Sequence, residues 1–90
     1  MKKYRILKKN IKVKSEFYFL GYYKNHEIKI EKDNLTWDEE SYTYPRWYIV
    51  VTGPNGGVCY DGWWGDYLRN TTIDDAIEEA LMGSKLIKVD

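Results

Sequence analysis

Residues 72–83 read TIDDAIEEALMG, and this stretch predicts the helix around which the rest of the chain must fold. Its apolar residues recur at spacings of three and four and form one stripe along a helix: Ile73, Ala76, Ile77, Ala80 and Leu81. Thr72 is placed to cap the free amide of Asp75, and the acids that follow it lie at the positive end of the helix dipole. A helix of roughly ten residues does not persist alone in water. The stripe must therefore be covered by other elements.

The sequence before this helix has the pattern of β-strands. Residues 27–32, EIKIEK, alternate apolar and charged side chains, which predicts a strand with a polar outer face. Alternation also runs through residues 11–19, and Gly21 is a candidate for a bulge. Residues 47–52, WYIVVT, and 58–60, VCY, flank the turn sequence GPNGG and predict a hairpin. We interpret residues 33–46 as an irregular connection and Asp61-Gly62 as a second turn. Residues 63–67 are a candidate for a short third strand of this meander, and residues 84–89 for an edge strand.

Strands followed by one amphipathic helix predict an α+β fold. We expect an antiparallel sheet of four to six strands with the C-terminal helix packed on one face. The chain has 90 residues, 43% of them hydrophobic and 17% aromatic, and no linker composition divides it. We therefore expect a single globular domain over residues 1–90.

Net charge and cysteine content exclude several classes. The 14 basic and 14 acidic residues cancel, which removes the positive surplus typical of nucleic-acid binders. No apolar run approaches the roughly 20 residues that span a bilayer, and no signal-peptide core follows the basic N-terminus. A single cysteine does not suit a disulfide-stapled secreted scaffold. These features predict a cytoplasmic protein without a membrane association.

No arrangement of residues points to catalysis. Cys59 and His26 are the only residues of their types, and no motif links them as nucleophile and base. We interpret Cys59 as a small core residue on a strand and His26 as a solvated turn residue. One Cys and one His cannot supply a standard four-ligand zinc site. We expect no enzyme activity, no cofactor and no metal.

Charge is segregated along the chain although its sum is zero. Residues 1–33 carry ten basic and four acidic groups, whereas residues 34–84 carry nine acidic groups and two arginines. On the helix, Asp74 with Glu78 and Asp75 with Glu79 form like-charge pairs that cost a few tenths of a kcal/mol each. Either these acids are screened by lysines of the N-terminal strands or simply solvated, or they form a surface for a basic partner.

The aromatic residues divide into two groups. Those on predicted strands are expected in the core: Phe17, Tyr18, Phe19, Tyr48, Trp47 and Tyr60. Those in predicted loops or beside turns are candidates for interface anchors: Trp37, Tyr42, Tyr44, Trp63, Trp64 and Tyr67. Trp63 and Trp64 cannot face the same side of a strand, so we expect one of them to be exposed or to lie under the long connection of residues 33–46.

These observations predict a non-catalytic protein-binding module with an acidic and aromatic surface. The candidate partner-binding residues are Trp37, Asp38, Glu39, Glu40, Tyr42, Tyr44, Asp61, Trp63, Trp64, Asp66, Asp74, Asp75, Glu78 and Glu79. The expected partner is a protein with a basic surface. The sequence does not determine an oligomeric state.

In its overall profile the chain resembles small phage- or plasmid-encoded inhibitors, anti-CRISPR proteins included. It shares with them a short single domain, abundant Lys, Asn and Ile, and separated charge. The resemblance implies that the acidic surface would block a basic groove on its target. The alternative hypothesis is a nucleic-acid- or polysaccharide-binding domain that uses the basic N-terminal sheet face, with Tyr4, Tyr22 or Tyr23 as stacking platforms.

Overall fold

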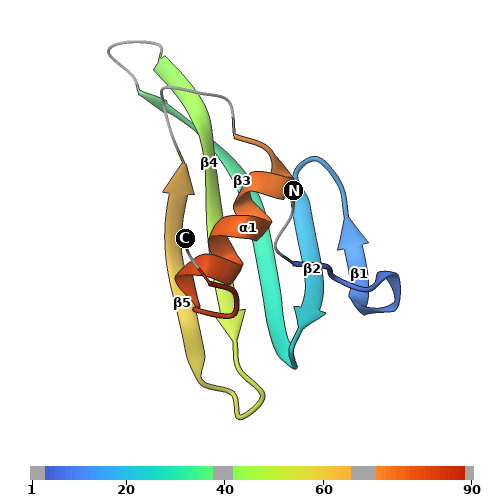
Figure 1. Cartoon of the computed structure of the whole chain (residues 1–90). Helices are drawn as coiled ribbons and strands as arrows, with labels where there is room; N and C mark the ends of the chain where they lie inside the picture. The colour runs from blue at the N-terminus through green and yellow to red at the C-terminus, as the bar shows by residue number, and fades with distance from the viewer. Residues whose placement is uncertain (1–3, 38–41, 66–70, 89–90) are drawn as a thin grey trace.

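The computed structural model describes residues 4–37, 42–65 and 71–88, which form one sheet and one α-helix. In chain order the elements are the 3-10 turn η1 (Lys8–Asn10), β1 (Ile11–Lys14), β2 (Tyr18–Tyr23), β3 (His26–Trp37), β4 (Tyr42–Thr52), β5 (Val58–Gly65) and α1 (Ile73–Gly83). The five strands lie in the order β1-β2-β3-β4-β5, and every neighbouring pair is antiparallel. α1 crosses one face of this sheet (Figure 1). The predicted α+β fold is confirmed.

Local sequence determines both short hairpin turns. Lys24 and Asn25 have φ values of 49° and 64°, the left-handed pair that a two-residue hairpin turn uses, and Tyr23 pairs with His26 on either side of them. Between β4 and β5, the Gly53 amide donates to the Gly57 carbonyl over 2.7 Å. The hairpin predicted from the GPNGG turn is therefore confirmed.

The irregular connection predicted for residues 33–46 is wrong, because β3 and β4 extend into it as a long hairpin. Their pairing runs from Glu27 opposite Thr52 to Trp37 opposite Tyr42. Pro45 within β4 has no backbone N–H, so it cannot donate a hydrogen bond to a neighbouring strand. Among the described residues, β4 pairs with β5 no further than Arg46, so the partner that the structure shows for Pro45 is Asn34 of β3.

Two other local predictions are also wrong. Asp61-Gly62 is not a turn, because β5 continues through it from Val58 to Gly65. Residues 84–88 form no strand but terminate the helix. The Leu86 amide donates to the Leu81 carbonyl over 2.8 Å, the Lys85 amide donates to the Met82 carbonyl over 3.0 Å, and Lys85 has φ 62°. These hydrogen bonds form a Schellman motif, which ends the helix and changes the direction of the chain at Lys85. Val89 lies outside the described residues.

The core lies between α1 and the sheet. It consists of the predicted helix stripe packed on the inward residues of three strands: Phe19, Ile28, Ile30, Trp47, Ile49 and Val51. The helix begins as expected, with a capping box between Thr72 and Asp75. The indole N–H of Trp47, which is 1% exposed, donates to Thr71 Oγ1 over 2.9 Å, so the largest core side chain leaves no buried donor without a partner.

Four residues that the sequence placed in the core lie elsewhere. Tyr18 precedes the buried Phe19 and therefore points to the opposite face of β2. Phe17 is 57% exposed, because β2 starts one residue later and only the Lys32 ammonium, 4.9 Å from the ring centroid, lies over it. Tyr48 follows the buried Trp47 and therefore points to the opposite face of β4. Cys59 is exposed because it is the extra residue of a bulge between Val58 and Tyr60.

Gly21 lies at a bulge, as its sequence context suggested. Pairing shifts from Ile11 opposite Gly21 to Val13 opposite Leu20, so that β1 carries one extra residue. A Cβ at Gly21 would lie 2.7 Å from Cζ of Phe19 and 3.0 Å from the Asn10 carbonyl oxygen. Only glycine allows the backbone to pass so close to the buried phenylalanine ring.

Gly21→Ala is expected to destabilise the protein by about 1–3 kcal/mol, because the fully buried Phe19 cannot move aside. Gly62→Ala is the matched control, since this glycine lies in β5 on the same face and a Cβ there meets nothing within 4 Å. Urea unfolding of both variants measures the difference. An equal free energy of unfolding for the two would contradict the packing described.

Candidate functional site

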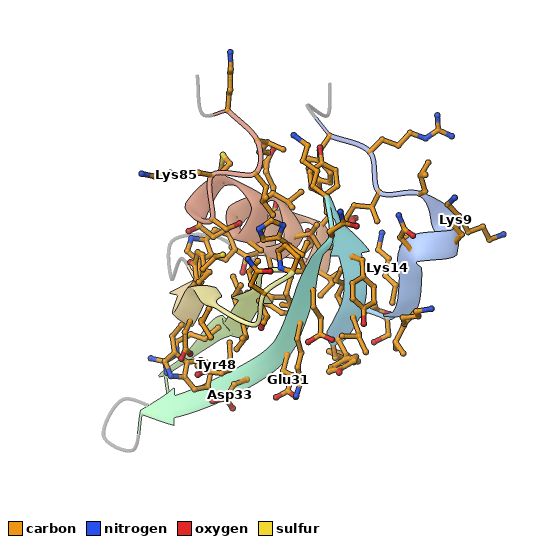
Figure 2. The ribbon with its side chains drawn as sticks, turned by 90° about the horizontal axis from the view of Figure 1, so that it is seen from below. Lys9, Lys14, Glu31, Asp33, Tyr48 and Lys85 are labelled. Carbon is orange, nitrogen blue, oxygen red and sulfur yellow. The ribbon has the colours of Figure 1, made fainter. Side chains whose placement is uncertain are left out.

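The face of the sheet away from α1 carries a row of four side chains across four strands, three of them aromatic. Strand register places Tyr18 opposite Glu31, Glu31 opposite Tyr48, and Tyr48 opposite Trp63. We call this side of the sheet the open face. Figure 2 shows Glu31, Asp33 and Tyr48 on it, on the far side of the sheet from the helix. No described helix or loop packs over the row.

At one end of this row four side chains form a connected group, which we call the open-face cluster: Arg46, Tyr48, Asp61 and Trp63. The rings of Tyr48 and Trp63 lie 4.8 Å apart between centroids and are tilted by 53°. The Arg46 guanidinium lies 4.5 Å from the centroid of the Trp63 ring. The Tyr48 hydroxyl donates to Asp61 Oδ1, and this hydrogen bond raises the pKa of Tyr48. Trp63 nevertheless remains 49% exposed.

Carboxylates outnumber cations on the open face. The strand register places Glu27, Glu31, Asp33 and Asp61 there, against Lys29 and Arg46. Lys29 lies 3.6 Å from Glu31, and the Tyr22 hydroxyl donates to Glu27 over 3.2 Å. On this face, strands β2–β5 therefore bring together two more carboxylates than cations, with one contact along β3 and one between β2 and β3.

Three of the four acidic residues of α1 have partners within the molecule. Asp74 forms an ion pair with Lys14 of β1 at 2.9 Å, and Asp75 closes the capping box. The Tyr60 hydroxyl donates to Glu79 Oε2 over 2.8 Å, and burial together with this bond raises the pKa of Tyr60. Of the two interpretations drawn from sequence, neutralisation by a strand lysine holds for Asp74.

The structure divides the predicted partner-binding residues between two sides of the sheet. Asp61 and Trp63 lie on the open face. Trp64 packs against the core on the other side of the sheet, where α1 with its four acids also lies. The expectation that one of the paired tryptophans is exposed is confirmed. Four of the predicted residues lie outside the described part of the chain, as does the predicted anchor Tyr67: Asp38, Glu39, Glu40 and Asp66. The side chains of Trp37, Tyr42 and Tyr44 also lie outside it.

Sequence reasoning missed Tyr18, Arg46 and Tyr48 as surface residues. Tyr48 was assigned to the core because its stretch, WYIVVT, is apolar throughout. The available signal was the alternation from Trp47, which places Tyr48, Arg46 and Val50 on one face once Trp47 is buried.

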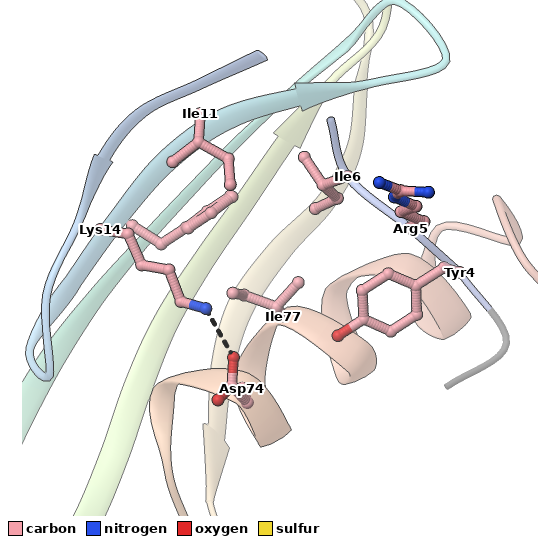
Figure 3. Close-up of a pocket in the computed structure, with 8 residues that line it drawn as sticks. Tyr4, Arg5, Ile6, Ile11, Lys14, Asp74 and Ile77 are labelled. Atoms are coloured by element: carbon pink, nitrogen blue, oxygen red, sulfur yellow. Dashed lines mark ion pairs between the residues drawn. The ribbon is translucent and has the colours of Figure 1, made fainter. Parts of the chain in front are cut away.

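A cavity of about 160 Å³ lies between the N-terminal segment and α1 (Figure 3). Ile6, Ile11 and Ile77 form apolar walls, and the Lys14–Asp74 ion pair crosses one side of it. Tyr4 lies beside the helix and packs edge-on against Tyr23, with centroids 6.4 Å apart. These two rings are partly buried against the core, so they are not free platforms for stacking bases or sugars.

Comparison with protein-family models found no match, and neither did comparison with curated proteins or with solved structures. Among the residues that the structure describes, no helix is long and apolar enough to cross a membrane. Within the same residues, no three His, Cys, Asp or Glu side chains are grouped so as to hold a metal ion. The open face, with its cluster of aromatic and charged side chains, is therefore the candidate functional site.

The negative charges of the helix acids act on Tyr4, whose raised pKa makes the stability of the fold depend on pH. Burial first, and then the charges of Asp74, Glu78 and Asp75, raise the pKa of Tyr4 from 10.0 to about 12. Because the folded state holds the phenol proton more tightly, stability is expected to be constant below pH 10 and to fall as pH rises from 10 towards 12. Tyrosinate absorbance of the folded protein, minus that of Tyr4→Phe, measures the pKa.

Asp74→Asn supplies the control for this titration. It removes the larger of the charge effects and leaves burial in place, so the pKa of Tyr4 should fall but stay above 10.0. A difference titration centred at 10.0 in the unmodified protein would contradict the placement of Tyr4 against α1.

Proposed function

We propose that the chain is a non-catalytic protein-binding module that contacts its partner through the open face, with Trp63 at the centre of the contact. The observation that carries the proposal is the open-face cluster: a half-exposed tryptophan held between a tyrosine and an arginine on a rigid sheet. Trp, Tyr and Arg are the residues most enriched at the energetic centres of protein interfaces.

The arrangement lowers the cost of binding. Trp63 and Tyr48 pack against each other, and Tyr48 is further held by its bond to Asp61. Side chains already fixed in the free protein lose little conformational freedom when a partner covers them. Their position on adjacent central and edge strands keeps the spacing between them fixed.

The charge of the open face favours a partner with a basic surface. Glu27, Glu31, Asp33 and Asp61 face Lys29 and Arg46, so the face has a net charge of −2 by residue count. A positive partner would be steered towards it and a negative one repelled. The helix acids are not required for this, because three of them already have partners within the molecule.

An inhibitory role is the finer form of this proposal. A 90-residue protein without catalytic machinery would inhibit by covering a functional surface of its target. On an anti-defence target of the anti-CRISPR kind, that surface would be a basic groove which the open face occupies in place of nucleic acid. The support for this form is the excess of carboxylates beside the aromatic row.

The proposal is tested by affinity capture from a native host lysate with three versions of the tagged protein. Trp63→Ala should abolish retention of the partner, because truncating an interface anchor costs about 2 kcal/mol or more. Phe17→Ala is the matched control, since it removes an equally exposed aromatic from outside the open face. Binding is then measured with the purified partner and the same variants.

Two outcomes would refute the proposed surface. One is a purified partner that binds Trp63→Ala as tightly as the unmodified protein. The other is retention that nuclease treatment abolishes and that purified nucleic acid restores, which would assign the open face to nucleic acid. With a protein partner, Asp33→Lys should slow association, and added salt should lessen its effect.

A further inference from the structure

The two edges of the sheet are built differently. β1 has four residues, two of them lysines, and contains a bulge. Short length, lysines and bulges are the devices that keep an edge strand from pairing with another chain. The β1 edge therefore carries all three.

β5, at the opposite edge (Figure 1), lacks most of this protection. It has eight residues, VCYDGWWG, with no lysine, arginine or proline among them. Its bulge at Cys59 disrupts only the beginning, so residues 60–65 pair regularly with β4. Among the described residues, no backbone hydrogen bond reaches β5 from its outer side. Half of its backbone groups thus remain available to another strand.

We propose that β5 pairs antiparallel with β5 of a second copy of this chain, across a two-fold axis at Gly62, and that the protein is a dimer. Such an axis stands perpendicular to the sheet, so both helices lie on the same side and the two open faces are continuous. This goes beyond the proposed function, because the contact uses the sheet edge and needs no other partner.

The register follows from the side chains of β5. An axis at Asp61 would place the two Asp61 carboxylates directly opposite each other, which is unfavourable. An axis at Gly62 places Tyr60 opposite Trp64 of the second copy on the helix side. On the open face it places Asp61 opposite Trp63 of the second copy. Within each copy the Arg46 guanidinium lies 4.5 Å from the centroid of the Trp63 ring, so Asp61 of one copy comes near Arg46 of the other. Aromatic pairs and opposite charges are both stabilising cross-strand partners.

Gly62 is suited to lie on the axis. It is on the helix side of β5, opposite Ile49, and a Cβ there would meet nothing within 4 Å. The packing of the monomer therefore does not require glycine at this position, unlike at Gly21. Without side chains, the two Gly62 residues can lie directly opposite each other with no steric conflict between them.

Sedimentation velocity over a concentration series up to roughly 1 mM tests for the dimer. Gly62→Lys should raise its dissociation constant at least about tenfold, because the two new ammonium groups would lie opposite each other at the axis. Val13→Lys, at the exposed position of the other edge, is the matched control and should leave the dimer unchanged.

Cross-linking tests the register. In a Cys59→Ser background, Gly62→Cys should give a disulfide-linked dimer under mild oxidation, whereas Val13→Cys should not. If Gly62→Lys does not fold, the Gly62→Cys variant still tests whether the dimer forms with its axis at Gly62.

A protein that stays monomeric throughout the series would overturn the proposal, as would a dimer that Val13→Lys weakens and Gly62→Lys does not. Both measurements use the purified chain alone. A monomeric protein whose open face still binds a partner would reject only the dimer. A dimer whose open face binds no partner would reject only the proposed function.

Discussion

The contact between α1 and one face of the sheet is the constraint on which the other features depend. Ala76 and Ala80 are fully buried, and their small side chains let the helix axis approach the strands closely. Ile77 and Leu81 then reach the inward rows of β2, β3 and β4. An eleven-residue helix would not form without this burial, and a sheet with both faces in water would have no core.

The polar contacts of α1 fix its orientation on the sheet rather than leaving its acids free. Lys14 reaches Asp74 from the β1 edge, and Tyr60 reaches Glu79 from β5, so each end of the helix is tied to a different edge of the sheet. The Lys14–Asp74 pair is half exposed and contributes little energy. The pair fixes the direction of the helix, and it gives a lysine partner to one of the acids that the sequence offered as a binding surface.

The sequence was informative wherever the signal is local. Two elements were predicted from such signals: the helix from the Ile73–Leu81 stripe with its Thr72 cap, and a strand from the alternation of residues 27–32. Because Trp63 and Trp64 are adjacent in sequence, they were also predicted to face opposite sides of a strand. The long pairing of β3 with β4 was missed because residues 33–46 show no clean alternation, and the pairing of two such stretches is a non-local fact. Tyr48 was misplaced for a related reason. An apolar stretch does not reveal which of its faces the helix will cover.

Because the single helix covers only one face of the sheet, two surfaces of different chemistry remain without a described partner: the open face and the β5 edge. The open face holds aromatic side chains with polar tips, which tolerate water and can also be buried. The β5 edge holds backbone groups, whose hydrogen bonds are satisfied by water until a strand replaces it. Trp63 belongs to both, because it lies on the open face and on the edge strand. Pairing about Gly62 would bring two Trp63 side chains, each with its Arg46, to either side of the axis. The open-face clusters of the two copies would then form one surface, and a partner binding across the axis would meet twice the aromatic area with both clusters fixed in place.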